Sequence, residues 1–364
     1  MIPRVTATID LAAIQHNLQQ VRRYAPGTRV MAAIKADAYG HGAVPVARAL
    51  EAVQVDAFAV ACMEEALKLR QAHILTPIVL LEGIISSEEA ALAVYERLQV
   101  VVHDFWQLEL LEALPESSEI SLWFKLDTGM HRLGFPMSEV PRLAEMLRSR
   151  PRWRFMGWMT HLACADEPQN PATKEQIERF DGVLRGLPGA RSIANSAAIL
   201  AWPDARADWV RPGLMLYGAS PIAERSAKDL GLKPAMTLES RLIAIREFSA
   251  GDPIGYGQTY RCPEKMPIGV VAVGYADGVH RSLPSGTPVL IKGRHARIAG
   301  RVSMDMITVD LRDIPDAQVG DRVRLWGEGL PVEDIAQRAG TLAYELLCGL
   351  TQRVLFLHQQ HRPF

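Results

Sequence analysis

The stretch VMAAIKADAYGHG, residues 30–42, sets the pattern for the first two-thirds of the chain. An apolar run typical of a buried strand leads into Lys35, and a turn flanked by glycines follows, carrying Tyr39 and His41. Each later apolar run is also followed by a polar turn and an amphipathic, helix-like segment. These runs predict strands at residues 30–36, 56–62, 77–83, 99–104, 120–129, 155–162, 191–196 and 208–218.

The repeat of strand and helix predicts an α/β fold. The predicted strands are almost continuously apolar, which is typical of parallel strands covered on both faces. Eight such units in succession favour a (β/α)8 TIM-type barrel over the competing interpretation, a doubly wound open sheet. A barrel places its active site at the carboxyl ends of its strands.

Beyond residue 235 the pattern changes to short alternating segments broken by Gly, Pro and Asp. This pattern predicts a mainly β C-terminal domain, followed by two short helices and a final strand. Residues 1–10 also read as a strand, which could pair with this β-rich part rather than with the barrel. We therefore expect a barrel at residues 11–234, and a β-rich domain at residues 235–364 that includes the N-terminal strand 1–10.

Composition excludes several classes of protein. Of the 364 residues, 48% are hydrophobic and 22% are charged, as in ordinary globular chains. The 40 basic and 41 acidic residues give a net charge of −1, so no overall field attracts nucleic acid or an anionic membrane. The sequence has no apolar window long enough to span a bilayer, and residues 1–20 lack the apolar core of a secretory signal.

The four cysteines are far apart, without a C-x-x-C pair or a histidine at metal-ligand spacing. We therefore expect free thiols in a reducing compartment, no metal site and a cytoplasmic location.

Polar residues gather at the predicted carboxyl ends of the barrel strands: Lys35, Arg132, His161, Asn195, Ser196 and Arg211. A lysine at a strand end often extends its ammonium to solvent, but it can also form a Schiff base. The turn after Lys35 favours the second interpretation, because its backbone N–H groups and the phenol of Tyr39 suit a phosphate.

AIKADAYGHG, at residues 33–42, resembles the cofactor-lysine signature of the alanine racemases. Further motifs follow in that family's order: KLDTGMHRLGF, MTHLA, NSAA, VRPGLMLYG, GYGQTY, VGYADG, VSMDM and YELLC. They run from Lys35 to Cys348. The resemblance implies a cofactor-binding barrel with a C-terminal β-domain, and pyridoxal 5′-phosphate as the cofactor.

The resemblance also implies catalytic roles. Lys35 would hold the cofactor as an internal aldimine and then serve as the base on one face of the substrate Cα. Tyr256, from a second subunit, would be the acid/base on the other face. His161, tied to Arg211, would assist Tyr256, and Arg211 would face the pyridine nitrogen. Without the family context, Tyr256 reads as a hairpin aromatic, His161 as a core histidine and Arg211 as part of a salt bridge.

The remaining roles concern the cofactor and the substrate. Cofactor binding would also involve Tyr39, Asn195, Ser196, Tyr344 and the backbone N–H groups of Gly213 and Leu214. Substrate binding would involve Arg132, Tyr275, Met304 and Asp305. Lys125 stands where many family members carry a carbamylated lysine, and an unmodified Lys125 is the alternative. His41 receives a local hydrogen-bonding role and no catalytic one.

The implied activity is interconversion of L- and D-alanine by an obligate homodimer with shared active sites, which links the chain to D-alanine metabolism and peptidoglycan precursors. The alternatives are a broad-specificity or serine racemase, or a decarboxylase, on the same scaffold. A cofactor carrier would lack the β-domain that holds Tyr256. A cofactor-free Schiff-base enzyme would have no phosphate for the AYGHG turn to bind. The sequence leaves open whether D-alanine is made or broken down.

Overall fold

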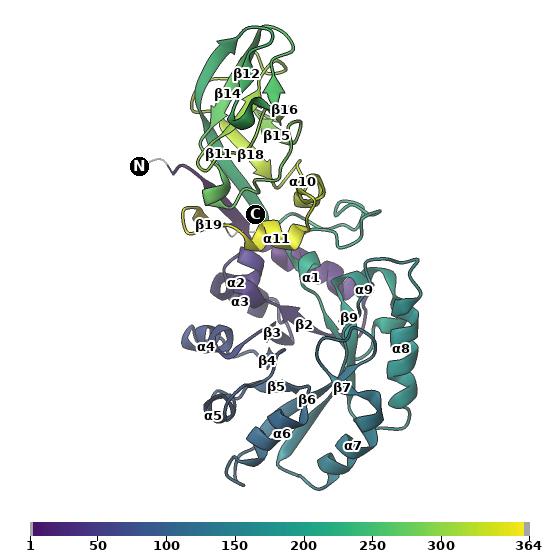
Figure 1. Cartoon of the computed structure of the whole chain (residues 1–364). Helices are drawn as coiled ribbons and strands as arrows, with labels where there is room; N and C mark the ends of the chain where they lie inside the picture. The colour runs from purple at the N-terminus through teal and green to yellow at the C-terminus, as the bar shows by residue number, and fades with distance from the viewer. Residues whose placement is uncertain (1–2, 360–364) are drawn as a thin grey trace.

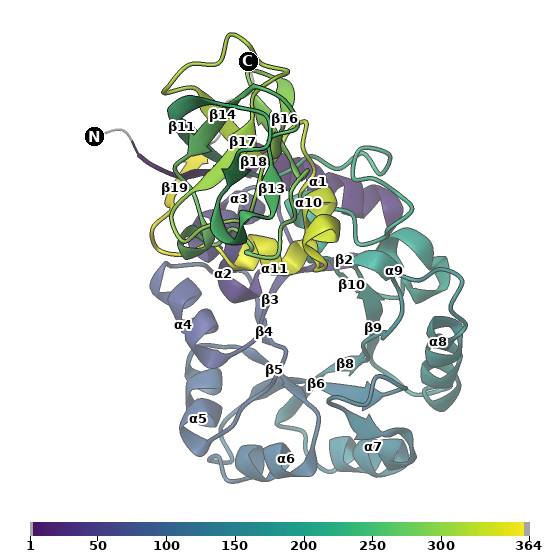
Figure 2. The same ribbon diagram turned by 45° about the horizontal axis from the view of Figure 1, so that its top comes forward.

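A computed structural model describes residues 3–359, and Figure 1 shows a barrel at one end of the chain's fold and a β-rich domain at the other. The barrel consists of parallel strands in the order β5-β4-β3-β2-β10-β9-β8-β6, and β5 also pairs with β6, which closes the ring. Figure 2 shows these strands surrounded by helices. The closed ring confirms the predicted barrel and excludes the open sheet. Its strands are β2 (Arg29–Ala33), β3 (Ala57–Val60), β4 (Ile78–Leu80), β5 (Gln99–Val102), β6 (Ile120–Asp127), β8 (Trp153–Met159), β9 (Ala190–Asn195) and β10 (Trp209–Arg211).

Helices cover the outside of the barrel; α1 precedes β2, and the others follow barrel strands. Several begin at side-chain caps: Asp10 accepts a hydrogen bond from the N–H of Ala13, and Ser86 from that of Glu89. The helices are α1 (Leu11–Tyr24), α2 (Lys35–Gly40), α3 (Ala43–Glu51), α4 (Met63–Gln71), α5 (Ser87–Tyr95), α6 (Phe105–Glu112), α7 (Val140–Arg148), α8 (Ala172–Val183) and α9 (Ser196–Ala201).

The strands are shorter than the sequence predicted, and two differences concern the site. The strand predicted at 30–36 stops at Ala33, so Lys35 begins α2 instead of ending a strand. The strand predicted at 208–218 stops at Arg211, because Pro212 has no N–H to continue the ladder. The short 3₁₀ helix η3 (Leu214–Tyr217) follows it.

The barrel interior is filled by side chains rather than open. Its inner cluster includes Met31, Val79, Val101, Trp123 and Trp209, and the two indole rings meet edge to face with centroids 5.9 Å apart. This packed layer closes the barrel below the carboxyl ends of the strands, which leaves that end free for a site.

The β-rich domain is built on a sheet with the order β14-β17-β16-β15-β18-β11-β1-β19. Strand β1 (Thr6–Asp10) lies between β11 (Met236–Phe248), which runs antiparallel to it, and β19 (Leu355–Gln359), which runs parallel. The predicted N-terminal strand therefore belongs to the sheet of the β-rich domain rather than to the barrel. Of the residues expected in that domain, 1, 2 and 360–364 lie outside the described structure. The other strands are β14 (Met266–Val271), β15 (Pro288–Ile291), β16 (Arg294–Ile298), β17 (Ile307–Asp310) and β18 (Arg322–Trp326), with β12 (Pro253–Ile254) and β13 (Tyr260–Arg261) in a separate hairpin.

Two short helices, α10 (Val332–Ala339) and α11 (Ala343–Cys348), connect the β-rich domain to the barrel. Figure 1 shows α11 lying on α2, the helix that begins with Lys35. The contact is close: a Cβ added to Gly40 would lie 2.2 Å from the carbonyl oxygen of Leu347. His358 adds a hydrogen bond of 2.8 Å to the carbonyl of His41. The β-rich domain thus rests against the turn that carries Lys35.

Within residues 3–359, no helix is both long enough and apolar enough to cross a membrane.

Candidate active site

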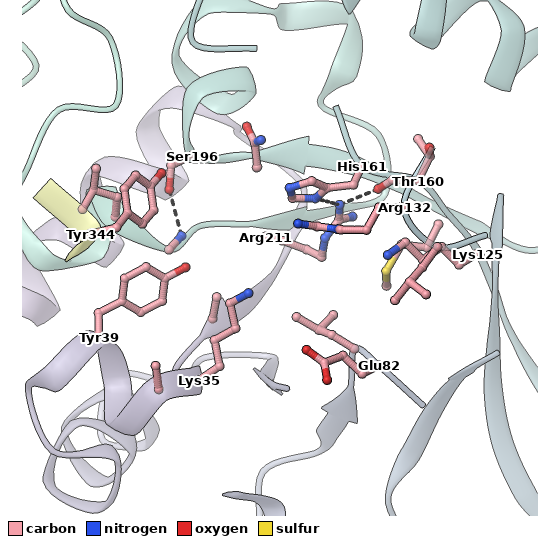
Figure 3. A pocket seen from close by; sticks show the side chains of 18 of the residues that line it. Lys35, Tyr39, Glu82, Lys125, Arg132, Thr160, His161, Ser196, Arg211 and Tyr344 are labelled. Atoms are coloured by element: carbon pink, nitrogen blue, oxygen red, sulfur yellow. Dashed lines mark hydrogen bonds between the residues drawn. The ribbon is translucent and has the colours of Figure 1, made fainter. Parts of the chain in front are cut away.

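One cavity of about 550 Å³ opens at the carboxyl ends of the barrel strands. Figure 3 shows side chains from several strand ends and from α11 pointing into it. Eleven of the fifteen residues predicted for the site line this cavity: Lys35, Tyr39, Lys125, Arg132, His161, Asn195, Ser196, Arg211, Gly213, Leu214 and Tyr344. The structure therefore brings together residues as far apart in the sequence as Lys35 and Tyr344.

The backbone after Lys35 adopts a left-handed conformation over four residues that are not glycine. From Ala36 to Tyr39, φ lies between 51° and 57°. This region costs roughly 1–2 kcal/mol per residue, because Cβ crowds the neighbouring carbonyl. The ring of His41 helps to hold the turn, since its Nδ1 lies 2.8 Å from the carbonyl oxygen of Tyr39. Burial lowers the pKa of His41 to about 4, so the ring is neutral, and its local hydrogen-bonding role is confirmed.

The left-handed turn directs Tyr39 to one end of the cavity. Its ring stacks on Tyr217 with centroids 4.8 Å apart and lies 5.8 Å from the ring of Tyr344. Burial raises the pKa of Tyr39 and raises that of Tyr344 to about 12, so both phenols keep their protons and can donate.

Ser196 lies at the same end of the cavity. Its Oγ accepts hydrogen bonds from the N–H groups of Gly213, over 2.8 Å, and Met215, over 3.3 Å. Because both lone pairs of the hydroxyl are used, its proton is left to donate toward the cavity. A Cβ at Gly213 would lie 2.4 Å from the hydroxyl of Tyr39, so the close approach of these groups requires glycine. Three hydroxyl donors thus face one corner, an arrangement that suits an anion.

Arg211 and His161 form the centre of the cavity wall. The guanidinium donates from Nη1 to Ser192 Oγ over 2.6 Å, and from Nη2 to the carbonyl of Thr160 over 2.5 Å. Nη2 also lies 3.3 Å from His161 Nδ1. Burial lowers the pKa of Arg211 to about 10, which still leaves it protonated near neutral pH.

The Arg211 contact determines how His161 is protonated. Because a guanidinium only donates, Nδ1 of His161 must accept. Burial and the neighbouring cations, Arg211 first among them, lower the pKa of His161 well below its usual value, so the ring is neutral. Its proton is therefore on Nε2, which is available to donate to a group in the cavity.

Lys125, on β6, is a buried amine among other cations. Burial, together with the charges of Arg211, Arg132 and Lys35, lowers its pKa to about 8. Figure 3 shows Arg132 between Lys125 and the Arg211–His161 pair. The cavity thus concentrates positive charge, which suits an anionic ligand and raises the neutral fraction of the Lys125 amine.

Asn195 ends β9, and the structure shows a structural role for it. Its side-chain oxygen accepts a hydrogen bond from the N–H of Ala198 over 3.0 Å and so caps α9. Its amide nitrogen remains as the group that can face a ligand in the cavity.

The other four predicted residues, Tyr256, Tyr275, Met304 and Asp305, do not line the cavity of their own chain. Tyr256 belongs to the β-rich domain and is 69% exposed. Tyr275 and Met304 are also exposed, and their loops are joined by a hydrogen bond from Ala276 N–H to the Met304 carbonyl. Asp305 pairs with Arg353 over 2.9 Å. The structure places these four in the β-rich domain, outside the set of residues that line the cavity with Lys35.

Sequence reasoning missed several residues that line the cavity. Glu82 is the one acidic residue among those that line it in the described chain, and Thr160, Leu342 and Cys348 also contribute. Glu82 follows the end of β4 at the same spacing that separates Lys35 from the end of β2. That strand-end position is the signal that could have found it.

No group of three or more His, Cys, Asp or Glu side chains within residues 3–359 is arranged to hold a metal ion.

Comparisons with known proteins agree with this site. Residues 9–221 match the family model of the alanine racemase N-terminal domain, and residues 235–357 match that of the alanine racemase C-terminal domain. A protein of Nitrosococcus oceani named alanine racemase is 53% identical over 350 residues, which cover 96% of this chain and 97% of that protein. The biosynthetic alanine racemase of Pseudomonas aeruginosa is 49% identical over 96% of this chain and 98% of its own length.

Solved structures agree as well. The crystal structure of biosynthetic alanine racemase from Pseudomonas aeruginosa has a TM-score of 0.95 and 48% identity, and the match covers 99% of this chain and 100% of that chain. The alanine racemase of Acinetobacter baumannii has a TM-score of 0.93 and 37% identity, over 98% of this chain and 100% of that chain.

Proposed function

Because this chain belongs to the alanine racemase family, a family of isomerases that work with pyridoxal 5′-phosphate, we propose that Lys35 carries this cofactor and that a second copy of the chain completes the active site. The reaction is the interconversion of L- and D-alanine. The observation that carries the proposal is the division of the site: eleven of its residues line one cavity, while the other four lie on the exposed β-rich domain.

The residues in the cavity fit the cofactor. The Lys35 amine supplies the covalent attachment, and the hydroxyls of Tyr39, Ser196 and Tyr344 supply donors for a phosphate. The backbone N–H of Leu214 and the amide of Asn195 complete this end, whereas the N–H of Gly213, which the sequence assigned to the phosphate, is donated to Ser196 Oγ and so orients that hydroxyl. When bound, pyridoxal 5′-phosphate withdraws electrons from the substrate Cα and so makes its proton removable.

Racemisation needs proton carriers on both faces of Cα. The Lys35 amine serves one face, and Tyr256 of the partner subunit serves the other. A phenol ordinarily ionises at about pH 10, so a phenolate base near neutral pH needs a donor that stabilises it. The Nε2–H of His161 is that donor, because Nδ1 is held by Arg211.

Arg211 also determines the strength of the electron sink. Its guanidinium keeps its proton and can only donate a hydrogen bond to the pyridine nitrogen. With the cofactor bound, Arg211 would leave the ring nitrogen without a proton, which would weaken the electron sink and favour return of the proton to Cα over side transamination. A carboxylic acid at this position would instead share a proton with the ring nitrogen, prolong the negative charge on Cα and favour side transamination.

Arg132 lines the cavity, and its planar fork would bind the substrate carboxylate and the cofactor's phenolic oxygen. Lys125 orients Arg132 once its amine has reacted with CO2, because the resulting carbamate is an anion beside a cation. The pKa of about 8 supports this, since only a neutral amine reacts. Tyr344 together with Tyr275, Met304 and Asp305 of the partner subunit limits the size of the substrate, which favours alanine over serine and larger amino acids.

A homodimer with two shared sites explains why Tyr256 is exposed in the single chain. One relative whose name includes the word biosynthetic, from Pseudomonas aeruginosa, supports a role in making D-alanine for peptidoglycan. We place the enzyme in the cytoplasm, where its four cysteines stay reduced.

Borohydride reduction followed by peptide mapping tests the proposal, beside a racemisation assay with alanine, serine and larger amino acids. We expect the pyridoxyl group on Lys35 alone and alanine to be the preferred substrate. A label on another lysine, or faster turnover of serine, would contradict it.

A further inference from the structure

The carboxylate of Glu65 connects the Lys35 turn to the neighbouring strand–helix unit. Glu65 is in the first turn of α4, and its Oε2 accepts a hydrogen bond from the N–H of Ala61 over 2.8 Å. Its Oε1 crosses to the turn after β2 and accepts from the N–H of Ala36 over 2.6 Å. One carboxylate therefore bridges the ends of two adjacent barrel strands.

The Ala36 N–H belongs to the peptide unit that joins Lys35 to Ala36. Holding this N–H fixes the plane of that peptide, and with it the direction in which the Lys35 side chain leaves the backbone. The bridge also lies where the chain enters the left-handed turn, since Ala36 is the first of the four residues with positive φ.

The rest of the turn is held at its far end. Asp37 Oδ1 accepts hydrogen bonds from the N–H of Ala43 over 3.0 Å and from Lys68 Nζ over 2.7 Å. The ring of His41 holds the carbonyl of Tyr39. Among the contacts of residues 3–359, Glu65 is the side chain that holds the turn next to Lys35 itself.

We propose that Glu65 is the positioning residue of Lys35, and that its two carboxylate oxygens orient the amine for cofactor attachment and proton transfer. This inference rests on the proposed role of Lys35. A carboxylate suits the task because each oxygen accepts from a different N–H. A glutamine has the same shape but one accepting oxygen, so it can satisfy one N–H and must present its own donors to the other.

Two experiments on the holoenzyme test the proposal, with Glu65→Gln as the variant and Glu64→Gln as the matched control. Glu64 is the preceding residue of α4 and is exposed. The first measures the visible circular dichroism of the bound cofactor and the rate at which hydroxylamine removes it. We expect Glu65→Gln to lose most of the dichroism and to release cofactor about tenfold faster, as befits the loss of one hydrogen bond to a charged acceptor. The control should match the parent chain.

The second experiment measures amide hydrogen exchange at Ala36 in the parent chain, which does not depend on whether any variant folds. Exchange should be strongly protected, and Glu65→Gln should remove that protection while thermal unfolding stays cooperative. Fast exchange of Ala36 in the parent chain, or a folded Glu65→Gln with unchanged dichroism and cofactor release, would overturn the proposal.

Borohydride labelling of the parent chain distinguishes a failure of the proposed function from a failure of this inference. If borohydride labels a lysine other than Lys35, the proposed function fails. If Lys35 is labelled and Glu65→Gln behaves like the parent, only the role of Glu65 fails.

Discussion

Nη2 of Arg211 lies 3.3 Å from Nδ1 of His161, and this contact makes the imidazole an acceptor on one side and a donor on the other. The same guanidinium is held by the hydroxyl of Ser192 and the carbonyl of Thr160. Two strand ends of the barrel thus set the orientation of one cation, and the cation sets the tautomer of the histidine.

Arg211→Glu should allow transamination of alanine as a side reaction, because an acid can share a proton with the pyridine nitrogen and prolong the charge on Cα. The measurement is pyruvate formation together with the visible spectrum of the variant. Arg211→Lys is the control, since it keeps a cation at the position. No pyruvate from a folded Arg211→Glu would contradict our account of this arginine.

Tyr256→Phe should affect the two substrate enantiomers unequally, because the phenol serves only one face of Cα. Loss of a general acid–base group typically costs about 10²- to 10⁴-fold in rate. Exchange of the Cα hydrogen with solvent deuterium, followed separately from L- and D-alanine, measures this. Tyr95→Phe, at an exposed tyrosine on α5, is the matched control. Equal losses from both enantiomers would rule out the assignment to one face.

Carbamylation of Lys125 should increase as pH rises through about 8, the pKa to which burial and Arg211 lower this amine, because only the neutral form reacts with CO2. Nuclear magnetic resonance with carbon-13-labelled bicarbonate measures the carbamate, and Lys125→Gln should lack the signal. Without CO2, the folded state holds fewer protons than the unfolded chain between about pH 8 and the ordinary lysine value of about 10.4, so stability should increase over that window. A carbamate signal that falls as pH rises would contradict the claim that the neutral Lys125 amine controls carbamylation.

Gly213→Ala should weaken cofactor binding, because the added Cβ would lie 2.4 Å from the hydroxyl of Tyr39. Overpacking of this kind costs about 1–3 kcal/mol. Equilibrium binding of pyridoxal 5′-phosphate measures the effect. Gly182→Ala on α8 is the control, since no atom lies within 4 Å of a Cβ added there. Unchanged affinity in Gly213→Ala would remove Tyr39 from the phosphate site.

The barrel and the position of its site could be predicted from the sequence because both depend on local patterns. Eight apolar runs determine eight strands, and the polar residues that end them must meet at one end of a closed barrel. Lys35, His161 and Arg211 were found in this way.

The conformation of the Lys35 turn could not be predicted in the same way. The left-handed region is intrinsically unfavourable for Ala36 and Ala38, so tertiary contacts must impose it. Glu65, which accepts a hydrogen bond from the N–H of Ala36, is 29 residues away in the sequence, so only the fold brings it to the turn. The ring of His41 adds a local hydrogen bond to the carbonyl of Tyr39. Glu82 was missed for a related reason, since an acidic residue at a strand end has no motif of its own.

The proposal places the Lys35 and Tyr256 of one active site in different subunits. Mixing Lys35→Ala subunits with Tyr256→Phe subunits tests this central claim most directly. Random exchange makes half of the dimers mixed, and each mixed dimer has one intact site, so activity should return to about a quarter of the parent level. If native mass spectrometry shows mixed dimers and the activity stays at the level of the two variants alone, the active site is not shared between subunits.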